Sequence, residues 1–242
     1  MNAVTVCVDM DDLLAITLPL NAHHFQHVLV VTAPHDHQTR KIVQKVANAS
    51  CHATDAFYRN DASFNKGLAI EEALDLLGRT KPSPAGWLAA VDADILLPPT
   101  LHYQELNQQC LYGAHRAILS DPKRYSRALD WNTLPTVPDG EIPGCFQLFH
   151  PNAEPLQSLP WFGIDWKHAG GYDSVFEAKF RPHNTRWLYD KILHLGPVGV
   201  NWCGRVTPRL DGAPIQNRQA HQNALQNLFA ARRTNDKDAE RL

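Results

Sequence analysis

The stretch WLAAVDADILLPP, residues 87–99, decides the fold expected of this chain. Its first half is an apolar run that predicts a buried strand, and the polar end of this strand begins at Asp92. Asp94 follows two residues later, so two carboxylates lie just beyond one strand. Carboxylate oxygens are hard ligands that suit Mg²⁺ or Mn²⁺, and these ions neutralise phosphate groups. The stretch therefore predicts a metal site at the carboxyl end of a strand.

Strands and helices alternate in the residues that precede this stretch. The predicted elements are strands at 4–8, 28–32 and 51–54, a helix or turn segment at 11–21, and helices at 37–46 and 68–77. Asp36 is a candidate N-cap for the second helix, and the first helix is expected to break near Pro19. The alternation predicts a parallel sheet with crossover helices, which binds ligands outside the carboxyl ends of its strands.

The second half of the chain is less regular. It is rich in Pro, Trp and Tyr, with strands expected at 111–119 and 145–150. Beyond Pro208 the sequence is polar and holds one amphipathic stretch near 224–231. We expect a single catalytic domain over 1–208, divided into halves 1–109 and 110–208, followed by a polar, partly helical appendage over 209–242.

Composition limits the classes of function and the compartment. A net charge of -2 makes long-range attraction to nucleic acid or anionic membranes weak. The five cysteines are scattered and include no C-x-x-C pair, which argues against a disulfide framework and a structural zinc site. The longest apolar runs are only a few residues, too short to span a bilayer. We therefore expect a cytoplasmic protein without a membrane span.

A second pair of carboxylates, Asp9 and Asp11, follows the first predicted strand. Haloacid-dehalogenase-like phosphatases use such a pair, together with a Thr or Ser that ends another strand and a Lys. Thr32 lies too close to Asp9 for that arrangement, and no lysine falls into place. We therefore expect Asp11 and Asp12 to cap the helix that follows.

Five motifs follow one another along the chain. They are VLVVTAPHDHQT, FNKGLAIEEAL, WLAAVDADILLPP, HAGGYDSVF and LHLGPVGVNWCGR. This ordered set, spanning about residues 4–206, resembles the GT-A-fold glycosyltransferases, most closely those of family 2. The resemblance implies an α/β, Rossmann-like, mostly parallel twisted sheet flanked by helices, with an irregular acceptor-side half. It also implies transfer of a sugar from a nucleoside-diphosphate sugar to an acceptor hydroxyl, with inversion.

The resemblance assigns roles at the donor end of the site. Asp94 matches a metal ligand for Mn²⁺ or Mg²⁺, and Asp92 would contact the ribose or the metal. His194 matches a late histidine that serves as a further metal ligand in some members. The alternative for His194 is a hydrogen-bonded core histidine.

Further residues are assigned to the donor and the acceptor. Asn65, Lys66 and Arg205 would contact the nucleoside or the diphosphate. Asp36 would replace the acidic nucleoside ligand that the family usually carries after its second strand, so the nucleotide stays open. Asp173 matches the carboxylate that takes the proton from the acceptor hydroxyl, although a simple N-cap is the alternative reading.

Other functions and acceptors remain open. A sugar-phosphate nucleotidyltransferase shares the sheet and the metal chemistry, but VDMDDLLAITLP lacks the glycines of its phosphate loop. A non-catalytic sugar-nucleotide-binding protein on the same fold is a second alternative. The acceptor could be a glycan or a hydroxylated base in DNA, since DPKRYSRALDW, residues 121–131, mixes basic and aromatic residues. We expect that segment to be a solvated loop, and the nucleic-acid interpretation stays open beside it.

Overall fold

The computed structural model describes residues 1–79, 86–103, 105–137 and 140–239. Within these residues the fold is α/β, and nine strands form one mixed sheet in the order β3-β2-β1-β4-β8-β6-β9-β5, with β7 paired to β6. The strands are β1 Asn2–Val6, β2 His27–Thr32, β3 Ala49–Ala53, β4 Leu88–Asp92, β5 Ile95–Leu96, β6 Leu111–Leu119, β7 Thr136–Val137, β8 Phe146–Phe149 and β9 Thr185–Leu195. The expected α/β architecture is confirmed.

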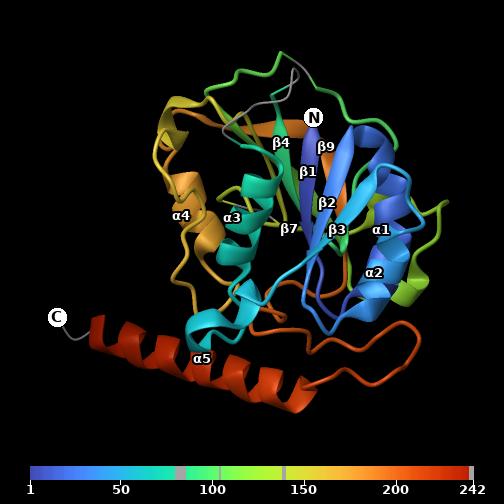
Figure 1. Cartoon of the computed structure of the whole chain (residues 1–242), viewed down its shortest axis with the longest axis vertical. Coiled ribbons are helices and arrows are strands. Elements are labelled where there is room, and N and C mark those ends of the chain that lie inside the picture. Colours follow the sequence, from blue (N-terminus) through green and yellow to red (C-terminus); the bar gives the residue numbers. More distant parts are fainter. Residues whose placement is uncertain (80–85, 104, 138–139, 240–242) are drawn as a thin grey trace.

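Helices cover both faces of the sheet (Figure 1). The α-helices are α1 Asp11–Asn21, α2 His37–Val43, α3 Lys66–Leu76, α4 Tyr172–Ala178 and α5 Arg218–Ala239. Short 3₁₀ turns complete the described elements: η1 Ala22–His24, η2 Ala56–Asp61, η3 Pro122–Arg124, η4 Trp131–Thr133 and η5 Glu154–Leu156.

Strands β3, β2, β1 and β4 run parallel to one another. Alternate side chains of β1 point to opposite faces, because successive residues of a strand alternate. Val4 and Val6 pack in the core cluster that includes α3 and α4, whereas Ala3 packs in the cluster that includes α1 and α2. Both faces are therefore buried, which explains why these strands are continuous apolar runs in the sequence.

The strand directions in the sheet change from all parallel to mixed after β4. This strand pairs in parallel with β1 on one side and antiparallel with β8 on the other. Long strand β9 then pairs in parallel with β6 and antiparallel with the short β5, so the second half is mixed. The pairing of β5 with β9 aligns Ile95 with His194 and so brings distant parts of the chain to the end of β4.

Helix α1 corrects two predictions. The helix does not break at Pro19 but continues through it to Asn21, because a proline in the last turn removes only one hydrogen bond. Asp11 and Asp12 lie in its first turn but make no capping hydrogen bond, and Met10 occupies the N-cap position. The carboxylates pair instead with arginines from the C-terminal part of the chain.

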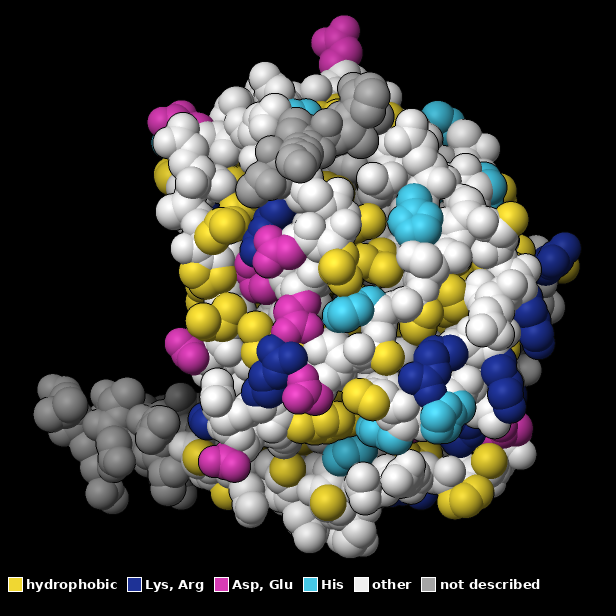
Figure 2. All heavy atoms as spheres, in the orientation of Figure 1, with side chains coloured by type: hydrophobic (Ala, Val, Ile, Leu, Met, Phe, Trp, Pro, Cys, Tyr) yellow, Lys and Arg dark blue, Asp and Glu magenta, His cyan; other side chains and the backbone are white. Residues whose placement is uncertain are grey.

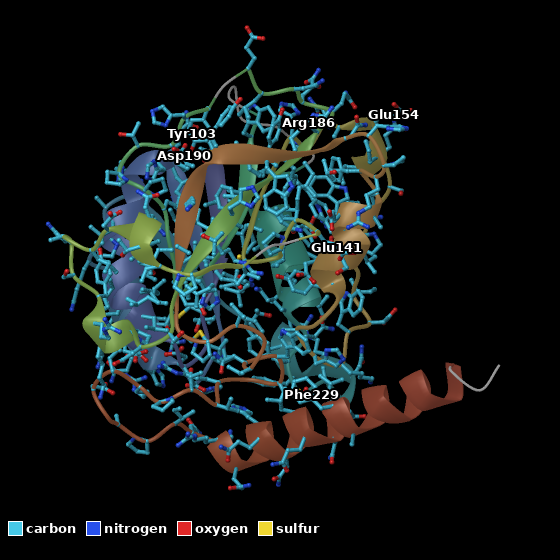
Figure 3. All side chains as sticks on the ribbon, turned by 180° about the vertical axis from the view of Figure 1, so that it is seen from behind. Tyr103, Glu141, Glu154, Arg186, Asp190 and Phe229 are labelled. Atoms are coloured by element: carbon cyan, nitrogen blue, oxygen red, sulfur yellow. The ribbon has the colours of Figure 1, made fainter. Side chains whose placement is uncertain are left out.

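Helix α5 lies along one end of the body (Figure 1). Its Phe229 lies on the side of the helix that faces the body (Figure 3) and approaches Trp202, with 5.9 Å between the ring centroids. The amphipathic stretch predicted near 224–231 lies inside this longer helix. Among the described residues, no helix combines the length and the apolar character that a bilayer crossing requires.

The surface and the cysteines fit the composition. On the face seen in Figure 2, acidic side chains adjoin basic ones at the left centre, and mainly basic side chains and histidines lie at the lower right. All five cysteines are free, and all but Cys51 are buried. No disulfide joins them, and all five lie among the described residues.

Candidate active site

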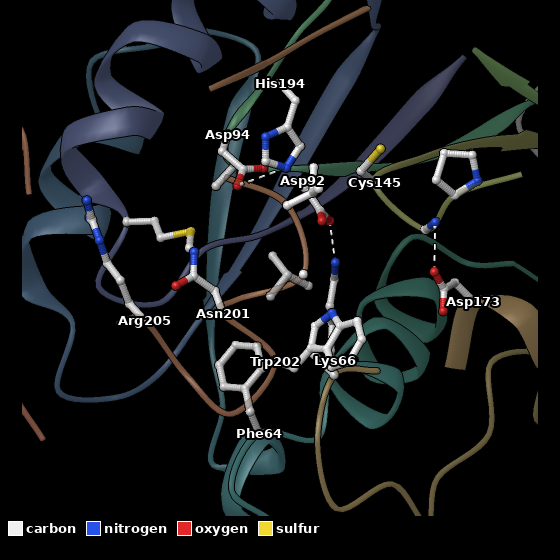
Figure 4. Close-up of a pocket in the computed structure, with 18 of the residues that line it drawn as sticks. Phe64, Lys66, Asp92, Asp94, Cys145, Asp173, His194, Asn201, Trp202 and Arg205 are labelled. Atoms are coloured by element: carbon white, nitrogen blue, oxygen red, sulfur yellow. Dashed lines mark hydrogen bonds and ion pairs between the residues drawn. The ribbon is translucent and has the colours of Figure 1, made fainter. Parts of the chain in front are cut away.

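A cavity of about 370 Å³ lies at the carboxyl ends of β1 and β4. One wall comes from the connection after β1, a second from the starts of α3 and α4, and a third from β9 and the residues that follow it (Figure 4). Phe64 and Trp202 contribute aromatic surface to it. The volume suits a small ligand. This is the edge of the sheet where the sequence predicts the site.

Asp94 and His194 meet in this cavity through strand pairing. The backbone N–H of Leu195 donates to the carbonyl of Asp94 at 2.8 Å, which continues the β5–β9 ladder. As a result, Nε2 of His194 lies 3.7 Å from Oδ2 of Asp94. Both residues are largely buried, at 7% and 8% exposure.

The atoms of this pair suit a divalent cation. Oδ1 of Asp94 is buried and has no hydrogen-bond partner among the described residues, which is costly for a carboxylate unless a ligand satisfies it. Nδ1 of His194 lies 3.0 Å from the carbonyl of Gly196, which favours a proton on Nδ1 and leaves Nε2 as a ligand. A carboxylate and an imidazole together suit Mn²⁺.

The predicted third metal ligand, Asp92, forms an ion pair instead. Its Oδ1 is paired with the ammonium of Lys66. Consequently no three Asp, Glu, His or Cys side chains of the described residues form a ready metal cluster. The structure thus brings Asp94 and His194 together and gives Asp92 a cationic partner.

Lys66 and Asp92 are electrostatically coupled. Burial by itself would lower the pKa of Lys66, but the Asp92 carboxylate outweighs this effect and raises it. Burial raises the pKa of Asp92, Lys66 acts against that rise, and Asp94 adds to it. The ammonium also lies 5.1 Å from the ring centre of Tyr172, a cation–π contact. Lys66 therefore stays charged inside the cavity.

Asp173 lies on the opposite side of the cavity, in the first turn of α4 (Figure 4). The N-cap is Gly171, in the left-handed region with φ 103°, so Asp173 is not the cap. The N–H of Gly144 donates to Oδ2 of Asp173 at 2.9 Å, and the hydroxyl of Tyr172 donates to the carbonyl of Gly144 at 3.2 Å. These bonds fix the orientation of the Asp173 carboxylate.

Arg205 lines the cavity but is engaged elsewhere. Its five N–H groups donate to the Asp12 carboxylate and to the carbonyls of Asp9, Thr207 and Pro208. Beside it, the Arg209 guanidinium is paired with Asp11. We call this pair of ion pairs the clasp. Arg205 thus anchors the segment after β9 to the start of α1.

Two predicted donor contacts lie outside the cavity lining. Asp36 accepts hydrogen bonds from Asp9, Thr32 and Thr39 and is the N-cap of α2. Asn65 is the N-cap of α3 and accepts from the N–H of Leu68. Both side chains are buried, so the structure gives each a local role in starting a helix.

Sequence reasoning missed Tyr172 and Gly144. Tyr172 is buried between Lys66 and the loop that holds Gly144. Adding a Cβ at Gly144 would place it 2.4 Å from the Cβ of Asp173, so only glycine permits this approach. Two sequence signals could have pointed to these residues: the aromatic residue directly before Asp173, and the Pro-Gly pair at 143–144.

Comparisons with known proteins concern the fold. No family model and no curated protein matches the sequence. A solved galactosyltransferase, LgtC, in complex with donor and acceptor sugar analogues, is similar with a TM-score of 0.48 and 10% identity, covering 94% of this chain and 96% of that chain. Glucosyl-3-phosphoglycerate synthase from Mycobacterium tuberculosis, solved with Mn²⁺, UDP and glucosyl-3-phosphoglycerate, has a TM-score of 0.47 and 13% identity, covering 81% and 72%.

A nucleotidyltransferase is similar as well. The 4-diphosphocytidyl-2C-methyl-D-erythritol synthase from Anaerococcus prevotii has a TM-score of 0.41 and 10% identity, covering 94% of this chain and 97% of that chain. At these identities the likeness concerns fold alone, and the ligands named are those of the other proteins.

Proposed function

We propose that this protein is a metal-dependent glycosyltransferase that moves a sugar from a nucleoside-diphosphate sugar to an acceptor hydroxyl. The observation that carries the proposal is the buried Oδ1 of Asp94, which no described residue pairs with, beside His194 and in one cavity with Lys66 and Asp173. An unsatisfied buried carboxylate atom indicates a missing ligand. The cationic and acidic groups around it suit a diphosphate on one side and a hydroxyl on the other.

The donor end of the proposal rests on Asp94, His194, Asp92 and Lys66. Asp94 and His194 would hold Mn²⁺ or Mg²⁺, which would neutralise charge on the departing diphosphate. Asp92 would accept hydrogen bonds from the ribose. Lys66, whose raised pKa keeps it protonated, would add a fixed positive charge near the diphosphate.

The acceptor end rests on Asp173. The Gly144 N–H binds Oδ2 of Asp173, which lines the cavity, and Oδ1 would then accept the proton of the acceptor hydroxyl. In a single displacement the acceptor oxygen bonds to the anomeric carbon while the bond from that carbon to the phosphate oxygen breaks. The proton of the acceptor hydroxyl passes to Asp173, and the nucleoside diphosphate leaves, which inverts the anomeric centre.

A donor screen tests this function. Purified protein is mixed with a panel of nucleoside-diphosphate sugars, with Mn²⁺ or with EDTA, and release of nucleoside diphosphate is measured. We expect slow release from one donor that requires metal and is lost in Asp94→Asn. Undiminished release by Asp94→Asn would count against the proposed site.

The same screen separates the alternatives by product. A sugar-phosphate nucleotidyltransferase would release pyrophosphate from a nucleoside triphosphate and a sugar phosphate, yet the connection Cys7–Met10 after β1 holds no glycine for a phosphate loop. A binding protein would be stabilised by the donor without any release. Glycans and DNA carrying hydroxymethylated bases are the acceptors to test once the donor is known.

A further inference from the structure

A second cavity, of about 670 Å³, lies outside the proposed active site. Its walls come from the end of α1, from β5 and β9, and from residues 125–132. It shares no lining residue with the first cavity, and one of its lining residues, Asp190, lies at the end of the molecule away from α5 (Figure 3). The proposed transfer reaction uses none of these residues.

A bulge in β9 presents Tyr189 to this cavity. Gly113 of β6 pairs with Trp187 and His115 pairs with Lys191, so β9 holds two more residues than β6 between these pairs. Tyr189 lies in the middle of the bulge and is 79% exposed, the largest value among the exposed large hydrophobic residues. Bulges re-aim side chains beside functional sites, and here the bulge turns an aromatic ring outward without a covering group.

The part of the lining formed by residues 125–132 is ordered by packing. Tyr125, Leu129 and Trp131 pack against the core cluster that includes Leu13 and Leu96, so the segment predicted as a solvated loop is partly buried. The N–H of Asn132 donates to the Asp130 carboxylate at 2.9 Å and fixes the turn. The cavity therefore has aromatic surfaces on two sides in a largely formed arrangement.

Charges around the cavity balance. Arg127 and Lys191 are cationic, whereas Asp130 and Asp190 are anionic. Asp190 is held in place, since the N–H of His102 donates to its Oδ2 at 2.6 Å. A phosphate backbone requires an excess of positive charge, which the described lining does not have. A neutral ligand with many hydroxyl groups suits this mixture of donors and acceptors.

We propose that the second cavity binds a neutral carbohydrate chain. The faces of sugar rings carry C–H groups that pack on the negative face of an aromatic ring, which Tyr189 offers from one wall and Trp131 from the other. The hydroxyl groups at the ring edges bind the charged planar groups of Arg127, Asp130 and Asp190.

Binding of neutral tetrasaccharides tests the proposal. Maltotetraose, cellotetraose and chitotetraose are titrated into the protein in EDTA, without any sugar nucleotide, and binding is followed by saturation-transfer NMR. We expect at least one to bind, Tyr189→Phe to bind it similarly, and Tyr189→Ala to lose about tenfold in affinity. Leu76→Ala, at a 60% exposed position on α3, is the matched control and should bind like the wild type.

Three results would overturn the proposal. The first is that no tetrasaccharide binds at about 10 mM. The second is equal binding by Tyr189→Ala and the wild type. The third is displacement of the sugar by a single-stranded oligothymidylate. Asp94→Asn should bind the tetrasaccharide normally. Failure of glycosyl transfer and failure of this second site are therefore distinguishable.

Discussion

The imidazole of His194 lies against the carboxylate of Asp94, with 3.7 Å between Nε2 and Oδ2. The two residues are far apart in the sequence and meet because β5 and β9 pair. The remaining carboxylate oxygen of Asp94 is buried and has no hydrogen-bond partner in the part of the chain that the structure describes. This relationship leaves one oxygen and one nitrogen ready to bind a cation, and the first prediction follows from it.

Loss of either ligand should weaken metal binding. We expect Asp94→Asn and His194→Ala each to raise the dissociation constant for Mn²⁺ by at least about tenfold, since even partners of metal ligands alter affinity by about 10–100-fold. The concentration of free Mn²⁺ is measured by electron paramagnetic resonance. Asp55→Asn, at an exposed position, is the control. Unchanged binding in both site variants would exclude this pair as the metal site.

Asp173 should affect the chemical step. We expect Asp173→Asn to lower kcat by about 10²–10⁴-fold, because an amide does not accept the acceptor proton. Donor affinity should stay unchanged, since Asp173 lies on the acceptor side. The two quantities are measured by nucleoside-diphosphate release and by donor titration. A variant with normal kcat would show that another group takes the proton.

Gly144 should matter through the position of Asp173. The Cβ of Gly144→Ala would lie 2.6 Å from Oδ2 of Asp173, which requires the carboxylate to move. We expect a fall in kcat of about tenfold or more, because small misplacements of reacting groups are costly. Gly140→Ala is the matched control, since its Cβ would meet no atom of the described residues within 4 Å. Equal activity of the two variants would contradict the proposed alignment.

The clasp should contribute to stability. The Arg205 side chain is 1% exposed and that of Asp12 is 6% exposed, so Asp12→Asn leaves a buried cation without its counter-ion. We expect the free energy of unfolding to fall by about 3–5 kcal/mol, as measured by urea titration. The double variant Asp12→Leu with Arg205→Met should lose less than the sum of the two single changes. Strict additivity would mean that the two residues do not interact.

The clasp also predicts an acid limit. Burial alone would raise the pKa of Asp12, but its hydrogen bonds to Arg205 and the nearby charges hold the pKa below its ordinary value. A depressed pKa gives stability that is present above the unfolded pKa of about 3.9 and is lost as pH falls through the folded value. Below about pH 4 the wild type should therefore lose stability more steeply than Asp12→Asn. Parallel curves would contradict this linkage.

Local patterns predicted the first half of the fold well. The strands expected at 4–8, 28–32 and 51–54 correspond to β1, β2 and β3, with ends shifted by one or two residues. Continuous apolar runs and helical periodicity are local signals, and burial on both faces reinforces them. The change to antiparallel pairing at β4 had no such signal, because strand direction depends on where the chain returns.

Local sequence patterns likewise indicated some residues of the candidate site but not the contacts between distant parts of the chain. Asp92 ends β4 and Asp94 follows it, and both could be placed at the cavity from the local sequence pattern. The pairing of Lys66 with Asp92 and of Arg205 with Asp12 joins residues distant in sequence, which spacing does not reveal. Asp11 and Asp12 were therefore misread as helix caps, and Tyr172 was overlooked.

The clasp has a consequence for the order in which the chain is made. Residues 197–205 form one wall of the cavity, and the ion pair between Arg205 and Asp12 links them to α1. Helix α1 is synthesised long before this segment. Until Arg205 and Arg209 have been synthesised, Asp12 and Asp11 lack the arginines with which they pair in the folded protein, and one wall of the cavity is incomplete. The cavity can therefore be completed only after the segment that carries Arg205 and Arg209 has been synthesised.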